Sequence, residues 1–377
     1  MFLGGASSTT EAELRPPSLK GLLRFWFRAV ALPSLGSWQA VQKVENELFG
    51  STNGQAGFFL SIVDSHGLNR VQPGQDWKNM HGLGYLGYGV VDRGVTRRPH
   101  LKHGGVFTLK VMFKDNVSPQ IGSLLPVALK ALGLFGAAGA RARKGFGSLS
   151  LESLRHNGEE KWVVPGNIEE LCAGIRKIFG EMGINRHEEG NLPDYTAFSL
   201  SAKVKIVKTA RDPLQLLDEV GKELLRYRSY GRASGSIHVL PWREKAEQNF
   251  ADDHDMILNV INGRTLQPPG HPRRVVFGLP HNYFFLSTRQ KASRKANVDA
   301  ANHKRRASPL FIHIHALSTG EYAAVLSLLP AIFLPEGELI KMSGGGYNVQ
   351  VACQVNYQEI ENFLTRSAFR DGVVVWP

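Results

Sequence analysis

The sequence predicts an α+β fold divided into two domains, and three observations support this prediction. The 377 residues exceed the length of one ordinary domain and suit two. Hydrophobic residues make up 42% of the chain, which is enough for packed cores, and charged residues only 21%, which argues against disorder by composition. Segments patterned like strands and segments patterned like helices occur together in both halves.

The first half begins with a small, polar loop at residues 2–12. An amphipathic helix is predicted over 17–31, because Pro17 suits the first turn of a helix and Ser18 suits its cap. The remaining predicted elements of this half are strands at 58–63, 106–113 and 148–154, a helix at 122–133, a glycine-rich stretch at 133–147, and long loops or a protruding hairpin at 64–105.

The second half mixes both kinds of element in the same way. Its predicted helices lie at 168–182, 213–228, 320–333 and 357–369. Its predicted strands lie at 197–207, 275–279, 310–316 and 348–355. From these patterns we predict an N-terminal domain at 1–160, a helical linker region at 161–195 and a C-terminal domain at 196–377.

The charge balance predicts an anionic partner. Lys and Arg together number 45 against 33 Asp and Glu, a net charge of +12, which suits nucleic acid, an anionic membrane surface or a polyphosphate. The two cysteines, Cys172 and Cys353, are too few for a disulfide framework or a cysteine zinc site. With no signal peptide and no apolar run of membrane-spanning length, we expect a cytoplasmic protein with no membrane partner.

A basic stripe is predicted on the first helix. Lys20, Arg24 and Arg28 are spaced by four residues and therefore share one helix face. No acidic residue lies between Arg15 and Arg28. We favour phosphate contact for this stripe, and the alternative is a solvated surface face.

The glycine-rich segment from Gly136 to Ser148 is a second candidate RNA contact. It offers cationic donors, a ring on which a base can stack, and glycines that let a backbone approach a ligand: Arg141, Arg143, Lys144, Phe146, Gly145 and Gly147. The segment lacks the ending of a P-loop, so we expect no nucleotide cofactor. The alternative is a flexible tight turn.

Two further stretches are candidate basic arms that order on a polyanion, or else solubilising loops. They lie at 93–103 and 289–306, and the second contains one acid, Asp299. The candidate RNA contacts in these arms are Arg97, Arg98, Arg305 and Arg306.

The candidates for metal chemistry are weaker. Asp252, Asp253, His254 and Asp255 form the densest cluster, but consecutive positions cannot all point at one ion. His313 and His315 share one face of a predicted strand, and no third ligand is identifiable, so structural histidines are the more common explanation. A metal-dependent hydrolase therefore stays an alternative, and we expect neither a metal nor a cofactor.

Several segments resemble the RAMP superfamily of CRISPR systems and, within it, the first subunit of the Cmr module, the type III-B effector. These segments are Gly4-Gly5, RPPSLKGLLRFWFR at 15–28, ENELFGS at 45–51, RKGFGS at 143–148, FGLP at 277–280 and RRASPL at 305–310. The motifs in the first 150 residues are the more specific ones.

This resemblance implies two ferredoxin-like domains joined by a helical region. It implies a non-catalytic subunit that contacts the 3′ part of a guide RNA and the 5′ part of the paired target RNA. It also implies other Cmr-type RAMP subunits as partners, one of which cuts the target. The protein would hold the backbone, with Gly4, Gly5, Gly145 and Gly147 as points of close approach, while base pairing reads the sequence.

The resemblance further implies an apolar strand before the Gly4-Gly5 loop. The sequence starts at Met1-Phe2-Leu3, within that loop, so we expect a sheet with unpaired backbone groups.

Two other functions are kept as alternatives. One is a metal-independent endoribonuclease of the same superfamily, with His100, His103 or His281 as the acid–base group. The other is a general RNA chaperone that has no partner subunits.

Overall fold

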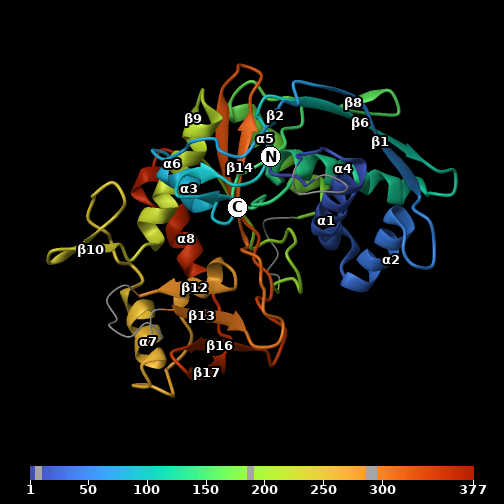
Figure 1. Ribbon diagram of the computed structural model, residues 1–377. Coiled ribbons are helices and arrows are strands. Elements are labelled where there is room, and N and C mark those ends of the chain that lie inside the picture. The colour runs from blue at the N-terminus through green and yellow to red at the C-terminus, as the bar shows by residue number, and fades with distance from the viewer. Residues whose placement is uncertain (5–10, 185–190, 286–294) are drawn as a thin grey trace. The chain divides into compact units, whose positions relative to one another are not determined.

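The computed structural model describes residues 1–4, 11–184, 191–285 and 295–377. The chain divides into two compact units, described separately below. The first unit contains Met1–Lys222, Phe311–Leu329 and Phe369–Pro377, and the second contains Glu223–Leu310 and Pro330–Ala368. Helices and antiparallel sheets occur in both units, which confirms the predicted α+β class (Figure 1). The sequence-based boundaries at 160 and 195 stay predictions.

Four helices form much of the core of the first unit. They are α1 (Pro16–Leu35), α2 (Trp38–Phe49), α4 (Pro119–Phe135) and α5 (Ile168–Glu181). The prolines at the start of α1 suit a helix N-terminus, and Gly36 ends this helix in the left-handed conformation at φ 75°. Ser37 caps α2 by accepting a hydrogen bond from the Ala40 N–H at 3.3 Å.

The N-terminal strands of this unit form an antiparallel pair, β1 (Phe58–His66) with β6 (Val106–Phe113). Between them the chain forms short pieces: β2 (Arg70–Val71), α3 (His81–Leu86), β3 (Val91–Asp92), β4 (Val95–Thr96) and β5 (His100–Leu101). The predicted strands at 58–63 and 106–113 are confirmed, and so is the helix predicted over 17–31.

A four-stranded sheet in the order β14-β15-β9-β18 completes the first unit. Its strands are β9 (Lys203–Ala210), β14 (Leu310–Ala316), β15 (Tyr322–Leu328) and β18 (Val373–Trp376). Along the chain, α6 (Pro213–Arg228) follows β9, and α8 (Gln358–Leu364) precedes β18. This βαββαβ order, with antiparallel neighbours at β9, is the connectivity of ferredoxin-like folds.

The predicted helix at 320–333 is wrong, because β15 occupies this segment as a strand. Val325, Leu326 and Leu328 are all 0% exposed. A strand that is buried on both faces is apolar at consecutive positions, so its pattern does not distinguish it from a buried helix.

The predicted strand at 148–154 is also wrong over most of its length, since β7 covers Ser153–His156 and pairs with β8 (Glu159–Val163). The preceding residues run beside β14 instead. The Ser148 and Ser150 hydroxyls accept hydrogen bonds from the Ile314 and Ala316 N–H groups at 3.0 and 2.8 Å. Serine hydroxyls thus accept the β14 hydrogen bonds that the carbonyls of a paired strand would accept. The alternation of residue types in the sequence does not distinguish these two arrangements.

The second unit has its own sheet, in the order β12-β13-β16-β17. Its strands are β12 (His281–Phe284), β13 (Lys295–Ala300), β16 (Leu339–Gly344) and β17 (Tyr347–Ala352). Helix α7 (Ala251–Ile261) shares a core with this sheet, and β10 (Arg232–Ser234) pairs with β11 (Ile237–Val239) in a hairpin.

The predicted strand at 275–279 is wrong, because the 3₁₀ helix η1 (Arg273–Phe277) lies there. Asp253 caps this helix by accepting hydrogen bonds from the Arg273 and Arg274 N–H groups, both at 2.8 Å. The cap comes from a distant segment and leaves no local signal.

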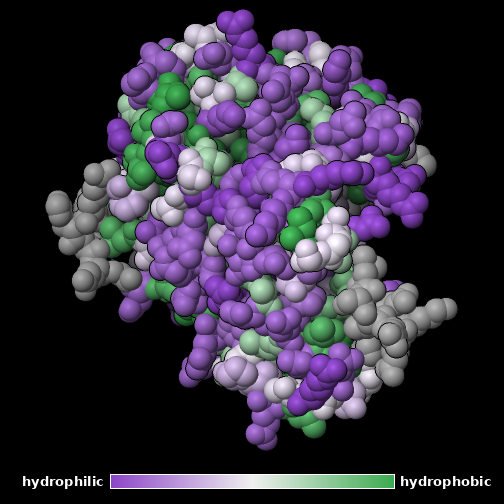
Figure 2. All heavy atoms as spheres, turned by 90° about the vertical axis from the view of Figure 1, so that its left-hand side faces the viewer, coloured by the Kyte–Doolittle hydropathy of each residue, from purple (hydrophilic) through white to green (hydrophobic). Residues whose placement is uncertain are grey.

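Hydrophilic side chains dominate the face shown in Figure 2, and hydrophobic ones gather there in small, separate patches. In the part of the chain that the structure describes, no helix is long and apolar enough to cross a membrane.

Candidate nucleic-acid interface

The predicted basic stripe lies on α1, but an acid from α2 partly neutralises it. Arg24 Nε donates a hydrogen bond to the Glu45 carboxylate, and Arg28 Nε lies 3.7 Å from its other oxygen. Glu45 is 7% exposed, so both guanidinium groups stabilise a buried charge. The expectation of a stripe without acids is therefore corrected, because Glu45 reaches the stripe from the neighbouring helix.

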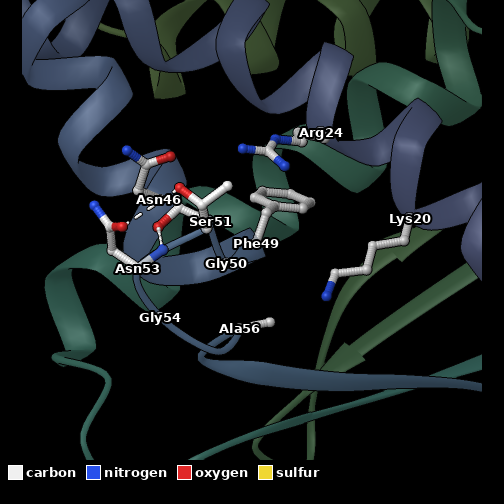
Figure 3. A pocket seen from close by; sticks show the side chains of 10 residues that line it. Lys20, Arg24, Asn46, Phe49, Gly50, Ser51, Asn53, Gly54 and Ala56 are labelled. Carbon is white, nitrogen blue, oxygen red and sulfur yellow. Dashed lines mark hydrogen bonds between the residues drawn. The ribbon is translucent and has the colours of Figure 1, made fainter.

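Lys20 and Arg24 line an open pocket of about 760 Å³ at the end of α2 (Figure 3). The lining contains no acidic side chain and consists of Lys20, Arg24, Asn46, Phe49, Gly50, Ser51, Thr52, Asn53, Gly54 and Ala56. We call this the α1–α2 pocket. In Figure 3, Arg24 lies above Phe49, Lys20 lies to one side of it, and the polar side chains Asn46, Ser51 and Asn53 lie to the other.

The turn after α2 supplies that polar side. Gly50 has φ 83°, and a Cβ there would lie 2.9 Å from the Ala56 nitrogen, so glycine is required. The Ser51 N–H donates to the Gly54 carbonyl at 2.9 Å, and the Ser51 hydroxyl accepts from the Asn53 N–H at 3.1 Å. The turn thereby holds hydroxyl and amide groups beside the two cations.

Positive charge is concentrated around Lys20. Its Nζ lies 5.1 Å from the centre of the Phe58 ring, and burial together with the charges of Arg24 and Lys114 lowers its pKa. The Lys114 Nζ lies 5.2 Å from the centre of the Phe59 ring. An anion bound here would relieve this repulsion, so the site is electrostatically suited to a phosphate.

The basic side chains of the glycine-rich segment are held against aromatic rings. Arg141 donates to the Tyr88 carbonyl, and its guanidinium lies 5.9 Å from the centre of the Tyr88 ring. Arg143 lies 5.4 Å from the Phe25 ring and 4.6 Å from the Phe311 ring. Lys144 Nζ is enclosed by protein. Arg141 is thus the exposed cation of the three.

Base stacking on Phe146 does not fit the structure. Phe146 is 4% exposed, and its ring packs against Phe2 and Trp77 at 5.5 and 6.1 Å. A Cβ on Gly145 would lie 2.4 Å from Leu217, and one on Gly147 would lie 2.2 Å from the Ala138 carbonyl oxygen. These glycines permit close packing within the protein, whereas they were expected to admit a ligand.

The other predicted contacts are not among the residues that line the α1–α2 pocket. Arg97 and Arg98 are exposed, and Arg97 pairs with Asp92 at 2.8 Å. In the second unit, Arg305 is exposed, while Arg306 donates to the Ile332 carbonyl at 3.1 Å. Gly4 is exposed. Gly5 and residues 289–294 of the second predicted basic arm lie outside the described residues.

The three candidate acid–base histidines differ in burial and in hydrogen-bond partners. His100 is 5% exposed, its Nε2 lies 2.9 Å from Gln75 Oε1, and burial lowers its pKa. His281 Nε2 lies 3.2 Å from Arg228, whereas His103 is exposed. The endoribonuclease with one of these histidines as its acid–base group therefore stays an alternative.

The candidate metal clusters have structural contacts. Both Asp253 oxygens accept backbone hydrogen bonds, and His254 stacks on Tyr230 with ring centres 3.8 Å apart. His313 and His315 are fully buried, with Nε2 and Nδ1 3.3 Å apart, and burial lowers their pKa values to about 3 and about 4. Within the described residues, no group of three His, Cys, Asp or Glu side chains is placed to hold a metal.

Sequence reasoning missed part of the pocket. Ser51 ends a segment used only for the family resemblance, and Asn46 lies within it, so that segment was the available signal. Lys114 carried no signal, because only the fold brings it near Lys20.

Comparisons with known proteins agree with this fold. Residues 1–150 match the model of the RAMP superfamily. The chain is 26% identical to CRISPR system Cmr subunit Cmr1-1 of Pyrococcus furiosus over 232 residues, 57% of this chain and 66% of that relative, just under two thirds of its length. It is also 26% identical to Cmr1-2 of the same organism over 174 residues, 41% of this chain and 91% of the relative.

A solved structure gives the same result for the fold. The crystal structure of Cmr1 from Pyrococcus furiosus, in its apo form, matches with a TM-score of 0.50 and 19% identity, covering 96% of this chain and 91% of that chain. Residues 1–150 of the chain are therefore similar to the RAMP superfamily, and the chain is similar to the Cmr1 subunits of CRISPR systems.

Proposed function

We propose that this chain is a non-catalytic RNA-binding subunit of a type III-B CRISPR ribonucleoprotein, acting in antiviral defence in the prokaryotic cytoplasm. It contacts the 3′ region of the guide RNA and the 5′ region of the paired target RNA. The observation that carries the proposal is the acid-free α1–α2 pocket, where Lys20 and Arg24 face the polar turn around Ser51. The similarity to Cmr subunits supplies the biological setting.

The mechanism is phosphate holding. Lys20 and Arg24 donate charge-assisted hydrogen bonds to phosphate oxygens, and the Ser51 and Asn53 side chains orient the neighbouring sugar or phosphate. Such contacts carry no sequence information, so guide–target pairing reads the sequence. Arg141 and the exposed Arg97 and Arg98 provide further phosphate contacts in the first unit, and the exposed Arg305 provides one in the second unit.

The partners follow from the same proposal. Other Cmr-type RAMP subunits assemble with this chain on the guide RNA, and target cutting belongs to one of them. Co-expression with the other subunits and copurification on a tag would test this part, and a chain that purifies alone would contradict it.

The experiment for RNA binding is a salt series with single-stranded RNA. A Lys20→Ala/Lys114→Ala variant removes one pocket cation and the lysine whose charge acts on it, and the matched control Lys43→Ala/Lys177→Ala removes two exposed lysines elsewhere in the first unit. We expect the wild type and the control to share a steep dependence of affinity on salt. Each lysine in contact with a phosphate contributes a slope of about one, so the pocket variant has a shallower slope.

Two results would contradict the proposal. Equal slopes for the wild type and the pocket variant would show that the pocket holds no phosphate. RNA cut by the wild type in the same samples would favour the endoribonuclease alternative.

A further inference from the structure

The β1–β6 pair has one face against the core of the first unit and one face in solvent. Alternate side chains of the two strands pack in the core: Phe58, Leu60, Val111 and Phe113. The residues between them point to the opposite side, which we call the outer face. On this face Phe59 lies opposite Met112, and Ser61 lies opposite Lys110.

Phe59 is an aromatic ring held in the open on a paired strand. It is 58% exposed, and Met112 opposite it is 47% exposed. The ladder between β1 and β6 fixes the backbone on both sides of Phe59. Because single exposed apolar side chains are ordinary, the surroundings of the ring decide what it can do.

Two lysines adjoin the ring. Lys114 Nζ lies 5.2 Å from the centre of the Phe59 ring and donates a hydrogen bond to Gln55 Oε1 at 3.0 Å. Lys110 is exposed and follows Met112 along the outer face. An aromatic ring beside exposed cations is the combination that binds single-stranded nucleic acid, through stacking of a base and pairing of its phosphate.

The acids of this region lie toward the ends of the outer face. Asp64 lies opposite Thr108, beyond the pair of Ser61 and Lys110. Asp115 is exposed and follows Lys114 in the chain, past the end of β6. Neither acid occupies the paired positions at Phe59, so the ring keeps a basic setting.

The outer face adjoins the α1–α2 pocket. Ala56 lines the pocket and lies three residues before Phe59, so their Cα atoms are at most about 11 Å apart. Lys114 connects the two, since it lies over the Phe59 ring and its charge lowers the pKa of Lys20 in the pocket. A phosphate held in the pocket therefore brings a neighbouring base within reach of the ring.

We infer that Phe59 is a stacking platform for one base of the RNA whose phosphate the α1–α2 pocket holds, an inference that rests on the proposed function. Lys114 pairs with the phosphate between the pocket and the stacked base. Every base has a π face, so the platform strengthens binding without reading sequence. A protein partner suits the ring less well, because charged residues are depleted in the core of protein interfaces and two lysines adjoin this ring.

The test compares RNA with inorganic polyphosphate, which has a chain of phosphates but no bases. Fluorescein-labelled single-stranded RNA is bound to the full chain and followed by fluorescence anisotropy, with polyphosphate as the competitor. Phe59→Ala should weaken RNA binding by about fivefold or more and leave polyphosphate binding unchanged. The slope of RNA affinity against salt should stay as in the wild type, because Phe59 carries no charge.

Two further variants make the result specific to the ring. Val63→Ala is the matched control, because Val63 is an apolar residue of the same strand with 56% exposure, and it should change neither affinity. Phe59→Trp should keep RNA binding, and its fluorescence should be quenched by RNA and not by polyphosphate. The same titration of the wild type, which has six tryptophans, gives the baseline, and circular dichroism confirms that each variant folds.

Three results would overturn the inference. Equal RNA affinity of the wild type and Phe59→Ala would show that no base stacks on the ring. An equal loss in Val63→Ala, or a matching loss for polyphosphate, would show that the effect does not come from a base. A Phe59→Ala variant that binds RNA normally and no longer copurifies with the other Cmr-type subunits would assign the ring to a protein partner.

Failure of the proposed function gives a different result. In that case the Lys20→Ala/Lys114→Ala variant and the wild type would have equal salt slopes, while Phe59→Ala would still weaken RNA binding. This outcome would remove phosphate holding at the pocket and retain the stacked base.

Discussion

The complete sheet of the first unit and its N-terminal β1–β6 pair differ in how fully they are closed. The sheet β14-β15-β9-β18 buries β14 and β15 so completely that β14 carries two neutral histidines in its interior. The β1–β6 pair has half-buried apolar side chains along a groove, and the α1–α2 pocket lies beside the start of β1, with Lys20 over Phe58. The comparison teaches that the closed region provides stability, whereas the open region carries the candidate binding surfaces.

The largest expected contrast is a pair of leucine truncations. Leu326→Ala in β15 removes a fully buried side chain and should lower the free energy of unfolding by about 2–5 kcal/mol. Leu109→Ala in β6 removes a half-buried side chain from an open groove and should lower it by about 1 kcal/mol or less. Urea unfolding of both variants measures the difference in unfolding free energy. Equal losses of stability would show that the two regions are packed equally tightly.

The buried histidines should make the complete sheet sensitive to acid. Burial lowers the pKa values of His313 and His315 to about 3 and about 4, against 6.5 for an ordinary histidine. Between these lowered pKa values and 6.5, the unfolded chain binds protons at the two histidines, whereas the folded chain does not. Stability is therefore full above pH 6.5 and falls as the pH decreases, by up to about 2.7 kcal/mol per pH unit for two protons.

Two variants isolate that effect from the titration of carboxylates. His315→Gln should reduce the slope of unfolding free energy against pH by about half between pH 4 and 6.5, because one of two protons is lost. His103→Gln, at an exposed position by the groove, should leave the slope unchanged. An unaltered slope in His315→Gln would show that the histidine does not cause the acid sensitivity.

A single pocket cation should affect RNA binding more than a cation of the complete sheet. Lys20→Ala should weaken binding of single-stranded RNA by roughly 1 kcal/mol, about fivefold. Lys208→Ala in β9, whose lysine pairs with Glu219, should leave affinity unchanged. Equal effects in a filter-binding assay would mean that RNA contact is not confined to the open region.

The smallest expected effect concerns Glu45. Glu45→Gln removes the negative charge that faces Arg24 and Arg28, so RNA affinity should rise by about two- to threefold at low salt. The gain should disappear at high salt because the charges are screened. An affinity that falls would show instead that Glu45 holds Arg24 in its binding position.

The sequence predicted this molecule best where local pattern decides structure. The helix at 17–31 and the strands at 58–63 and 106–113 follow from proline placement and alternation. The error at 320–333 arose because β15 is apolar at consecutive positions, from Ala323 to Leu326, as a buried helix also can be. Elements without an expectation include α2 and β16, although Ser37 gives α2 a local cap.

The candidate site was predicted only in outline. Lys20 and Arg24, predicted as RNA contacts, line the α1–α2 pocket, but the pairing of Arg24 with Glu45 depends on how α1 packs on α2. Phe146 illustrates the opposite error, because an aromatic residue between glycines resembles a stacking platform until its burial is known. Charge and residue type are visible in a sequence, whereas partners and exposure are determined by the fold.

The most direct test of the central claim is a cross-linking map. RNA carrying 4-thiouridine would be bound to the chain, irradiated and digested, and mass spectrometry would identify the cross-linked peptides. Phosphate holding at the α1–α2 pocket predicts cross-links in peptides that cover residues 15–28 and 49–56. Cross-links confined to the second unit, with none in these peptides, would contradict the account.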